Sequence, residues 1–224
     1  MKARVLVMMS GSISAYKVCH VLSRLKQAGH DVEVVASPWA LKFVGEATIE
    51  GLTGHPVRKS MFGSGAHMAH ISLIRWADVV IVCPATANTI NKLATGVGDD
   101  LMTTLFLAHD FTKPWLIAPA MNSKMYHHPV TQSSVAKLRA MGCEILETAS
   151  GVLACGEVGD GKLLDSELLL QEVLRRLPIT ARAEREGKPA SPSAPPGRGQ
   201  RILITSGGTE EPIDPVRSLT NTST

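Results

Sequence analysis

Three apolar runs of strand length each end in a turn of small or hydroxyl-bearing residues, and each turn precedes a stretch with helical character. The runs cover residues 3–9, 31–36 and 79–83, and the turns begin at Ser10, Ser37 and Pro84. Strands that alternate with helices are typical of parallel sheets, whose strands end at one common edge and bind ligands there. The sequence therefore predicts a three-layer α/β domain with a mostly parallel sheet and a ligand at that edge.

The first turn, residues 10–14, precedes an amphipathic stretch over residues 15–28 that we expect to be a helix. Backbone N–H groups and hydroxyls at a helix N-terminus form an anion site, so this turn predicts a phosphate ligand. The alternative is a serine that only caps the helix. The turn lacks the G-x-G-x-x-G pattern and the phosphate loop ending in G-K-[ST], so no motif indicates a dinucleotide or ATP site.

Two further turns have the same character. Ser37 either faces the ligand or caps a helix that we expect to begin near Trp39. The turn over residues 84–89 opens a helix expected over residues 90–95. Because three such turns are hard to explain as independent caps, together they favour a planar ligand that carries a phosphate.

A fourth apolar run, residues 115–118, is stopped by Pro119 and leaves Asn122 in the following turn. Such a turn would open into the same cleft as the other three. The alternative is an asparagine that bonds only its own backbone. Other segments are expected as a loop-rich crossover (45–65), helices (101–108, 131–141 and 165–177) and a short last strand (144–146).

Residues 151–163 contain four glycines in thirteen positions, which predicts a mobile flap and not a core element. Cys155 lies within this flap, where a packing role is not expected. A thiol with its ordinary pKa of roughly 8.5 is protonated at neutral pH and can act as a general acid. The alternative of a buried, inert thiol fits Cys19 and Cys143 better.

His67 and His70 lie three residues apart on an expected helix before the third strand. No third ligand stands near them at metal-binding spacing, so we expect no metal site. The cysteines are widely spaced, with no C-x-x-C pair, and should be free thiols.

Charge and composition exclude several classes of protein. The chain has 224 residues and a net charge of +3, and its Lys and Arg residues are dispersed, which disfavours nucleic-acid binding. No stretch approaches the roughly 20 apolar residues of a membrane span. We therefore expect a soluble, cytoplasmic protein with neither nucleic-acid nor membrane partners.

The last part of the chain changes character. Residues 178–200 are rich in Pro, Ala, Ser and Gly and form an expected linker after a domain over residues 1–177. A new strand is expected over residues 201–205. Residues 201–224 are too few for a domain, so we expect them to be the truncated, disordered start of a second α/β domain.

Five stretches in this order resemble the flavin-dependent cysteine decarboxylase family, including the decarboxylase half of bifunctional enzymes of coenzyme A biosynthesis. They are residues 11–15, 69–71, 84–89, 119–125 and 154–163. Residues 201–221 resemble the start of the ligase half, whose nucleotide-binding body and catalytic lysine would lie further along. We therefore expect no ligase activity from this chain.

The resemblance implies a Rossmann-like (flavodoxin-like) sheet, FMN as cofactor, and a homotrimer or dodecamer. FMN would be held by Gly11, Ser12, Ser14, Ser37, Pro84, Ala85, Thr86, Ala87, Asn88, Thr89 and Thr103. The catalytic residues would be His70, Asn122 and Cys155, and the substrate-binding residues Asn122, Met125, Ala154 and Lys162. The enzyme that the chain resembles usually carries Arg near Lys162 and Met near Leu163.

The implied reaction is the decarboxylation of 4′-phosphopantothenoylcysteine to 4′-phosphopantetheine. A cysteine carboxylate has no electron sink, and oxidation of its CH2–SH group to a thioaldehyde by FMN creates one. In this scheme His70 assists thiol deprotonation or orients the substrate, Asn122 holds the carboxylate and Cys155 protonates the enethiolate. The alternatives are a flavin prenyltransferase and a regulatory flavoprotein without enzymatic activity.

Overall fold

The computed structural model describes residues 2–61, 69–152, 158–178, 210–212 and 218–220. For residues 69, 70, 152 and 158, and for those of the last two ranges, only the backbone is described. The chain divides into two compact units, Met1–Gly187 and Lys188–Thr224, which are described separately.

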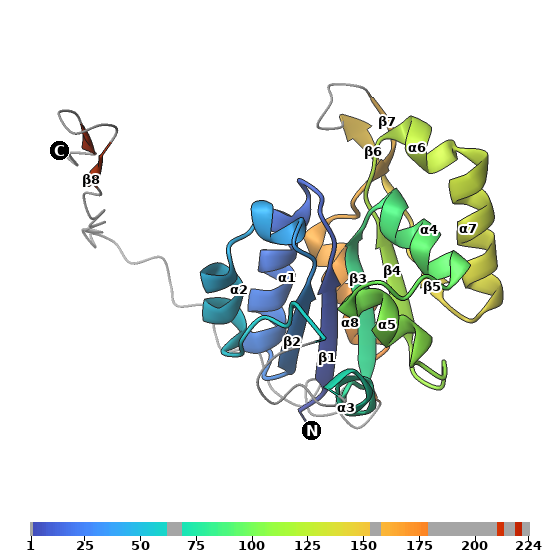
Figure 1. The fold of residues 1–224 in the computed structure, drawn as a ribbon, viewed down its shortest axis with the longest axis horizontal. Helices are drawn as coiled ribbons and strands as arrows, with labels where there is room; N and C mark the ends of the chain where they lie inside the picture. The colour runs from blue at the N-terminus through green and yellow to red at the C-terminus, as the bar shows by residue number, and fades with distance from the viewer. Residues whose placement is uncertain (1, 62–68, 153–157, 179–209, 213–217, 221–224) are drawn as a thin grey trace, which may run out of the picture. The chain divides into compact units, whose positions relative to one another are not determined.

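A five-stranded parallel sheet forms the centre of the first unit (Figure 1). Its strands, in the order β2-β1-β3-β4-β5, are β1 (Arg4–Met9), β2 (Asp31–Ala36), β3 (Val79–Ala85), β4 (Trp115–Pro119) and β5 (Glu144–Ile145). This is the strand order of the flavodoxin-like folds, in which the connections leave β1 and β3 toward opposite faces of the sheet. The predicted parallel α/β fold is confirmed.

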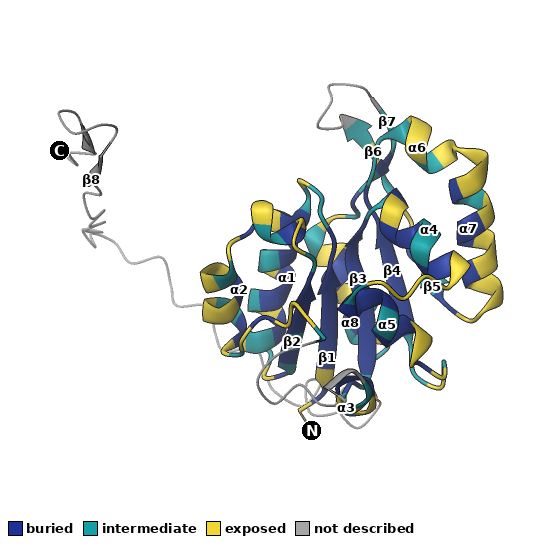
Figure 2. Ribbon diagram, in the orientation of Figure 1, coloured by how far each residue is buried: buried dark blue, intermediate teal, exposed yellow. Residues whose placement is uncertain are grey.

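Helices cover both faces of the sheet. One face packs against α1 (Ala15–Gln27), α2 (Glu46–Thr53) and α8 (Ser166–Arg175), and the other against α3 (Ala69–Trp76), α4 (Ala87–Thr95), α5 (Leu101–Leu107) and α7 (Pro129–Ala140). Figure 2 shows the strands as a buried layer between helices whose outer sides are exposed. Two short elements complete the unit at the strand ends, the 3₁₀ turn η1 (Ala40–Lys42) and α6 (Ser123–His127).

The strands are apolar throughout because both of their faces are buried. In β1, Val5 and Val7 pack with α1, whereas Leu6 and Met8 point into the core on the other face. Alternate residues of a strand point to opposite sides, so a strand covered on both faces needs a continuous apolar run.

Two expectations on local structure were wrong, and one helix was missed. The segment 45–65, expected as a loop-rich crossover, contains α2, which begins after Gly45 in extended backbone and ends at Gly54 in the left-handed region. The fourth helix begins at Ala87 and not at residue 90, because the Thr86 hydroxyl accepts a hydrogen bond from Thr89 N (3.3 Å) and caps it. The short helix α6 was not predicted.

The expected flap over residues 151–163 is built on a β-hairpin. Its arms, β6 (Ala149–Val152) and β7 (Val158–Lys162), pair antiparallel, and Leu163 is buried in the core. The O atom of Gly161 accepts a hydrogen bond from Met121 N (2.8 Å). A Cβ at Gly161 would lie 2.7 Å from Met121 O, so this close approach requires glycine. The prediction of a segment outside the core was therefore wrong for Leu163.

In the second unit, β8 (Glu210–Pro212) and β9 (Ser218–Thr220) pair as an antiparallel hairpin. The strand expected over residues 201–205 lies outside the described residues. The expected domain boundaries stay predictions. In the described part of the chain, none of the helices combines the length and apolar character that crossing a membrane requires.

The connection between α5 and β4 contains a buried histidine. His109 is 6% exposed, and its Nδ1 accepts a hydrogen bond from Phe111 N (2.9 Å), which helps to hold Phe111 at φ 57°. Its ring lies edge-on to Trp115, with centroids 4.9 Å apart. Burial lowers the pKa of His109, and Lys113 lowers it further against the opposing effect of Asp110. The folded protein therefore holds His109 neutral.

We expect His109 to make the protein less stable in acid. The folded-state pKa lies below the unfolded value of about 6.5, so the unfolded chain binds a proton that the folded chain does not, and the free energy of unfolding falls as pH drops through that window. His109→Asn, which keeps an acceptor near Phe111 N, should flatten this dependence in urea titrations at several pH values. The control His128→Asn changes an exposed histidine and should leave the slope unchanged. An unaltered slope in His109→Asn would contradict this account.

Candidate functional site

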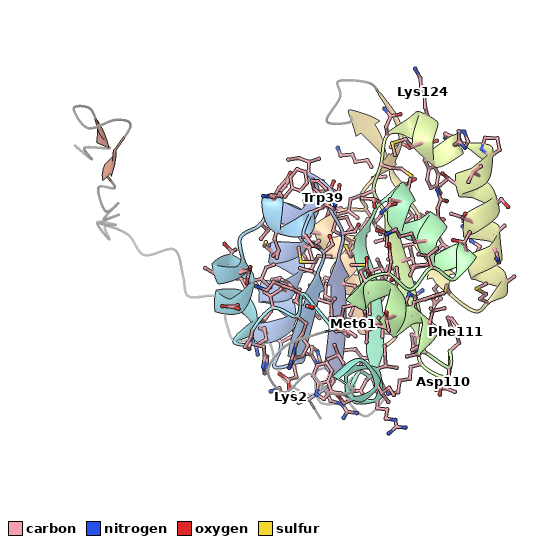
Figure 3. The ribbon with its side chains drawn as sticks, viewed as in Figure 1. Lys2, Trp39, Met61, Asp110, Phe111 and Lys124 are labelled. Atoms are coloured by element: carbon pink, nitrogen blue, oxygen red, sulfur yellow. The ribbon has the colours of Figure 1, made fainter. Side chains whose placement is uncertain are left out.

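A cleft of about 600 Å³ lies at the carboxyl ends of β1, β2 and β3. This is where the sheet order reverses and where open α/β sheets bind ligands. Trp39, labelled in Figure 3, marks the side of the cleft next to β2. The cleft is lined by Ser10, Gly11, Ser37, Pro38, Trp39, Thr86, Asn88, Thr89, Lys92, Asp99, Asp100, Met102, Thr103 and Met125.

Ser10 joins the first and third turns at the floor of this cleft. Its hydroxyl donates to Pro84 O (2.6 Å) and accepts from Thr86 N (3.1 Å), and Ser10 N donates to Pro84 O (3.3 Å). The side chain is 3% exposed, so these bonds replace water for the buried groups. The ends of β1 and β3 are thereby held in one geometry.

The first turn presents a helix N-terminus beside the cleft. The Ser12 hydroxyl accepts from Ser14 N (3.2 Å), and the Ser14 hydroxyl does not cap α1. Gly11 lines the cleft, and a Cβ at this position would lie 2.4 Å from Trp39 Cβ. Glycine is therefore required by the close approach to Trp39. The positive end of the α1 dipole suits an anion.

Ser37 lies at the cleft surface and has the capping role that the sequence left open, whereas its contact with a ligand stays a prediction. It lines the cleft, and its hydroxyl also accepts a hydrogen bond from Ala40 N (3.1 Å), capping η1. Its backbone N donates to Met9 O (2.9 Å), so the second turn is tied to the end of β1.

The third turn contributes three of its six predicted residues to the cleft surface. Thr86, Asn88 and Thr89 line the cleft, and the hydroxyls of the two threonines lie 3.1 Å apart. The other three, Pro84, Ala85 and Ala87, are buried behind that surface. These three residues support the turn from behind. Pro84 O, for example, accepts the hydrogen bond from the Ser10 hydroxyl.

Thr103 also lines the cleft, but its hydroxyl is already bonded. It donates to the Asp100 carboxylate (2.9 Å) and accepts from Asp100 N (3.1 Å), and the Asp100 carboxylate in turn accepts from Thr103 N (2.8 Å). This reciprocal pair is a capping box that starts α5.

The turn after β4 is placed beside the cleft by α6. Met125 of this helix lines the cleft. Asn122 caps α6, with Oδ1 accepting from Lys124 N (2.8 Å), so the backbone role left open by the sequence is present. Neither Asn122 nor Lys162, which lies on β7, is among the residues that line the cleft.

His70 is not brought together with the cleft within one chain. It lies on α3, which leads into the amino end of β3, at the edge of the sheet opposite the cleft (Figure 1). Ala154, Cys155 and His67 lie outside the described residues. Within the described ranges, no three His, Cys, Asp or Glu side chains are grouped as metal ligands.

Several cleft residues were missed by the sequence analysis: Ser10, Pro38, Trp39, Lys92, Asp99, Asp100 and Met102. Two signals were available. Ser10 directly follows a strand that ends at the cleft, and Lys92 lies three residues after Thr89, on the same side of a helix.

None of the described cysteines lines the cleft. Burial raises the pKa of Cys83 and of Cys143 to about 12, and it also raises the pKa of Cys19. All three are free thiols, as predicted.

Comparison with known proteins places the chain in a family. Residues 1–178 match the family described as Flavoprotein. The chain belongs to this flavoprotein family. Residues 197–224 match the DNA/pantothenate metabolism flavoprotein C-terminal domain.

Curated relatives of this flavoprotein include the coenzyme A biosynthesis bifunctional protein CoaBC from two bacteria. That of Vibrio vulnificus (strain YJ016) is 39% identical over 222 residues, which are 98% of this chain and 51% of the relative. That of Bacillus subtilis (strain 168) is 40% identical over 222 residues, again 98% and 51%. The chain thus spans about half the length of the curated relatives it matches.

Solved structures with the same fold include a cysteine-to-serine mutant of PPC decarboxylase complexed with pantothenoylaminoethenethiol. It is 30% identical, with a TM-score of 0.69, and the match covers 84% of this flavoprotein and 100% of that chain. The FMN-binding protein AtHal3 is 30% identical, with a TM-score of 0.67 and coverage of 85% and 100%. The FMN-dependent cysteine decarboxylase SpaF is 32% identical, with a TM-score of 0.65 and coverage of 80% and 97%.

We expect Ser10→Ala to lower the free energy of unfolding by about 1–3 kcal/mol, because it leaves the partly buried Thr86 N–H without its acceptor. The matched control is Ser12→Ala, which removes one bond from a half-exposed turn and should lower it by about 0.5–1.5 kcal/mol. Urea denaturation of the two variants measures the difference. Equal losses of unfolding free energy in the two variants would show that the bridge between the first and third turns contributes no more to stability than the bond within the first turn.

Proposed function

We propose that this chain is an FMN-dependent decarboxylase that converts 4′-phosphopantothenoylcysteine to 4′-phosphopantetheine in coenzyme A biosynthesis. One observation carries the proposal: a cleft rich in hydroxyl groups lies at the β1/β3 switch point of a fold shared with PPC decarboxylase and FMN-dependent cysteine decarboxylases. The bifunctional relatives are named as coenzyme A biosynthesis proteins, which supports the assignment to that pathway.

The chemistry of the cleft fits FMN. The phosphate would lie on the first turn (Gly11, Ser12, Ser14), at the positive end of α1 and away from the two carboxylates at the α5 side of the cleft. Ser37, the third turn from Pro84 to Thr89, and Thr103 would complete the site, with Pro84, Ala85 and Ala87 in support and the others in contact. The apolar surfaces of Trp39, Met102 and Met125 suit a flat ring.

When bound, FMN would supply an electron acceptor that oxidises the CH2–SH carbon of the substrate, so that carbon dioxide can leave, and would then return the electrons. Asn122 would hold the substrate carboxylate through its amide nitrogen, since the bond from Lys124 N to Oδ1 fixes the orientation of the side chain. His70 would take the thiol proton or orient the thiol, and Cys155 would protonate the enethiolate that is left after decarboxylation.

The remaining substrate contacts would come from the two elements beside the cleft. Met125 of α6 contributes an apolar surface at its rim. Lys162 ends β7, where Gly161 O accepts the hydrogen bond from Met121 N in the turn before α6. Ala154, which lies outside the described residues, would also contact the substrate. Lys162 would supply positive charge toward a phosphate group of the substrate.

We further infer that the active form is a homo-oligomer, a trimer or a dodecamer. Within one chain, the helix that carries His70 lies at the opposite edge of the sheet from the cleft. A second copy could bring its own His70 to this cleft and complete the catalytic set.

The decisive experiment uses the whole chain with added FMN. We expect a flavin absorption spectrum and, on anaerobic incubation with 4′-phosphopantothenoylcysteine, a product lighter by one carbon dioxide in mass analysis. Bound flavin with unchanged substrate would contradict the decarboxylase and favour a prenyltransferase or a regulatory flavoprotein. Absence of flavin binding would contradict the cleft assignment as well.

Replacing the proposed acid should separate the two halves of the reaction. Cys155→Ser should still release carbon dioxide, but an oxidised, decarboxylated product should accumulate because the enethiolate is not protonated. Cys19→Ser, a thiol on α1 that does not line the cleft, is the matched control and should give normal product. Normal turnover by Cys155→Ser would remove Cys155 from the mechanism.

A further inference from the structure

An ion pair that the proposed mechanism does not use lies on the wall of the cleft. Lys92 Nζ and Asp99 Oδ2 are 2.6 Å apart, and both residues line the cleft. The side chain of Lys92 is 29% exposed and that of Asp99 is 52% exposed. The hydrogen bond to Asp99 raises the pKa of Lys92, so its ammonium stays charged.

The backbone holds the two partners in place. Lys92 lies on the last turn of α4, on the side that also carries Asn88 and Thr89. The helix ends at Gly96, in the left-handed region, and Val97 N donates back to Lys92 O (3.1 Å). The chain therefore turns sharply and returns Asp99 to the side chain of Lys92.

The cleft has few charged residues, so this ion pair is important for the electrostatics of the cleft. Among the described residues that line it, Lys92 alone is a cation, and Asp99 and Asp100 are the anions. The Asp100 carboxylate is engaged by Thr103 at the start of α5. Lys92 is therefore the group that can stabilise negative charge developing on a ligand in the cleft. Asp99 orients the Lys92 side chain.

Reduction of a flavin creates such a charge. Two electrons and one proton added to the oxidised ring leave it with one negative charge, whereas its phosphate is unchanged. We propose that Lys92, positioned by Asp99, stabilises the reduced, anionic flavin over the oxidised one and so sets the redox potential of the site. This inference rests on the proposed function, because it requires FMN in the cleft.

An electrostatic role and a structural role predict different signs for the two partners. Lys92→Met removes the cation and should lower the midpoint potential. Asp99→Asn removes the anion and should raise it. If the ion pair were merely structural, loss of either partner would disturb the site in the same way. Both variants would then shift the midpoint potential in the same direction.

The test measures the dissociation constants of oxidised FMN and of FMN reduced anaerobically with dithionite, which supplies the two electrons. For Lys92→Met we expect the ratio of the reduced to the oxidised constant to rise about tenfold, a fall of about 30 mV in potential. Asp99→Asn should lower the ratio, and Lys92→Arg, which keeps the charge, should leave it within about threefold of the parent chain. Lys137→Met on α7 and Asp110→Asn, at the far edge from the cleft in Figure 3, repeat the charge changes at exposed positions and should not alter it.

Three outcomes would overturn the inference: shifts of the same sign in Lys92→Met and Asp99→Asn, an unchanged ratio in both, or equal shifts in the exposed controls. A fourth concerns the phosphate. If Lys92→Met weakens oxidised FMN but not oxidised riboflavin and leaves the ratio unchanged, Lys92 binds the phosphate and not the ring. Failure of the unaltered chain to bind FMN would instead refute the proposed function, so the two failures are distinct.

Discussion

The bridge from Ser10 to the turn after β3 is the constraint on which the site depends. One buried hydroxyl at the end of β1 accepts from Thr86 N and donates to Pro84 O, which also accepts from Ser10 N, so it pairs an amide and adds a second bond to a carbonyl at the end of β3. Because β1 and β3 are neighbours whose following helices lie on opposite faces, their ends diverge and open a cleft. Ser10 fixes the width of that opening at its floor.

The residues around the cleft divide into those that support it and those that face a ligand. Thr86 caps α4, Ser37 caps η1 and Asp100 caps α5, so the local hydrogen bonds that start three elements also form the wall of the site. Capping fixes these side chains without added strain, because the first N–H groups of a helix need partners in any case. A polar cleft built in this way is preorganised for a ligand that carries both a phosphate and a ring.

The core explains why such a cleft can be rigid. The strands are buried on both faces, with alternate residues of β1 packed against α1 on one side and the α4 and α5 side on the other. The sheet is therefore held between two closely packed layers of side chains, which keep the strand ends in place. The hairpin of β6 and β7 joins this frame at Gly161, where the backbone approaches Met121 too closely for any side chain.

The sequence by itself determined the alternation of strands and helices, the parallel sheet and most turn residues, because apolar periodicity and helix caps are local signals. It could not determine which residues of the third turn reach the surface of the cleft. Ala85 and Ala87 belong to the same run of small residues as the others in that turn, yet both are buried. Only the tertiary structure brought Lys92 and Asp99 to the cleft and set the helix of His70 at the far edge of the sheet. The physical reason is that local patterns specify which face of an element is buried, whereas the meeting of distant side chains depends on strand order and on the paths of the connections between strands.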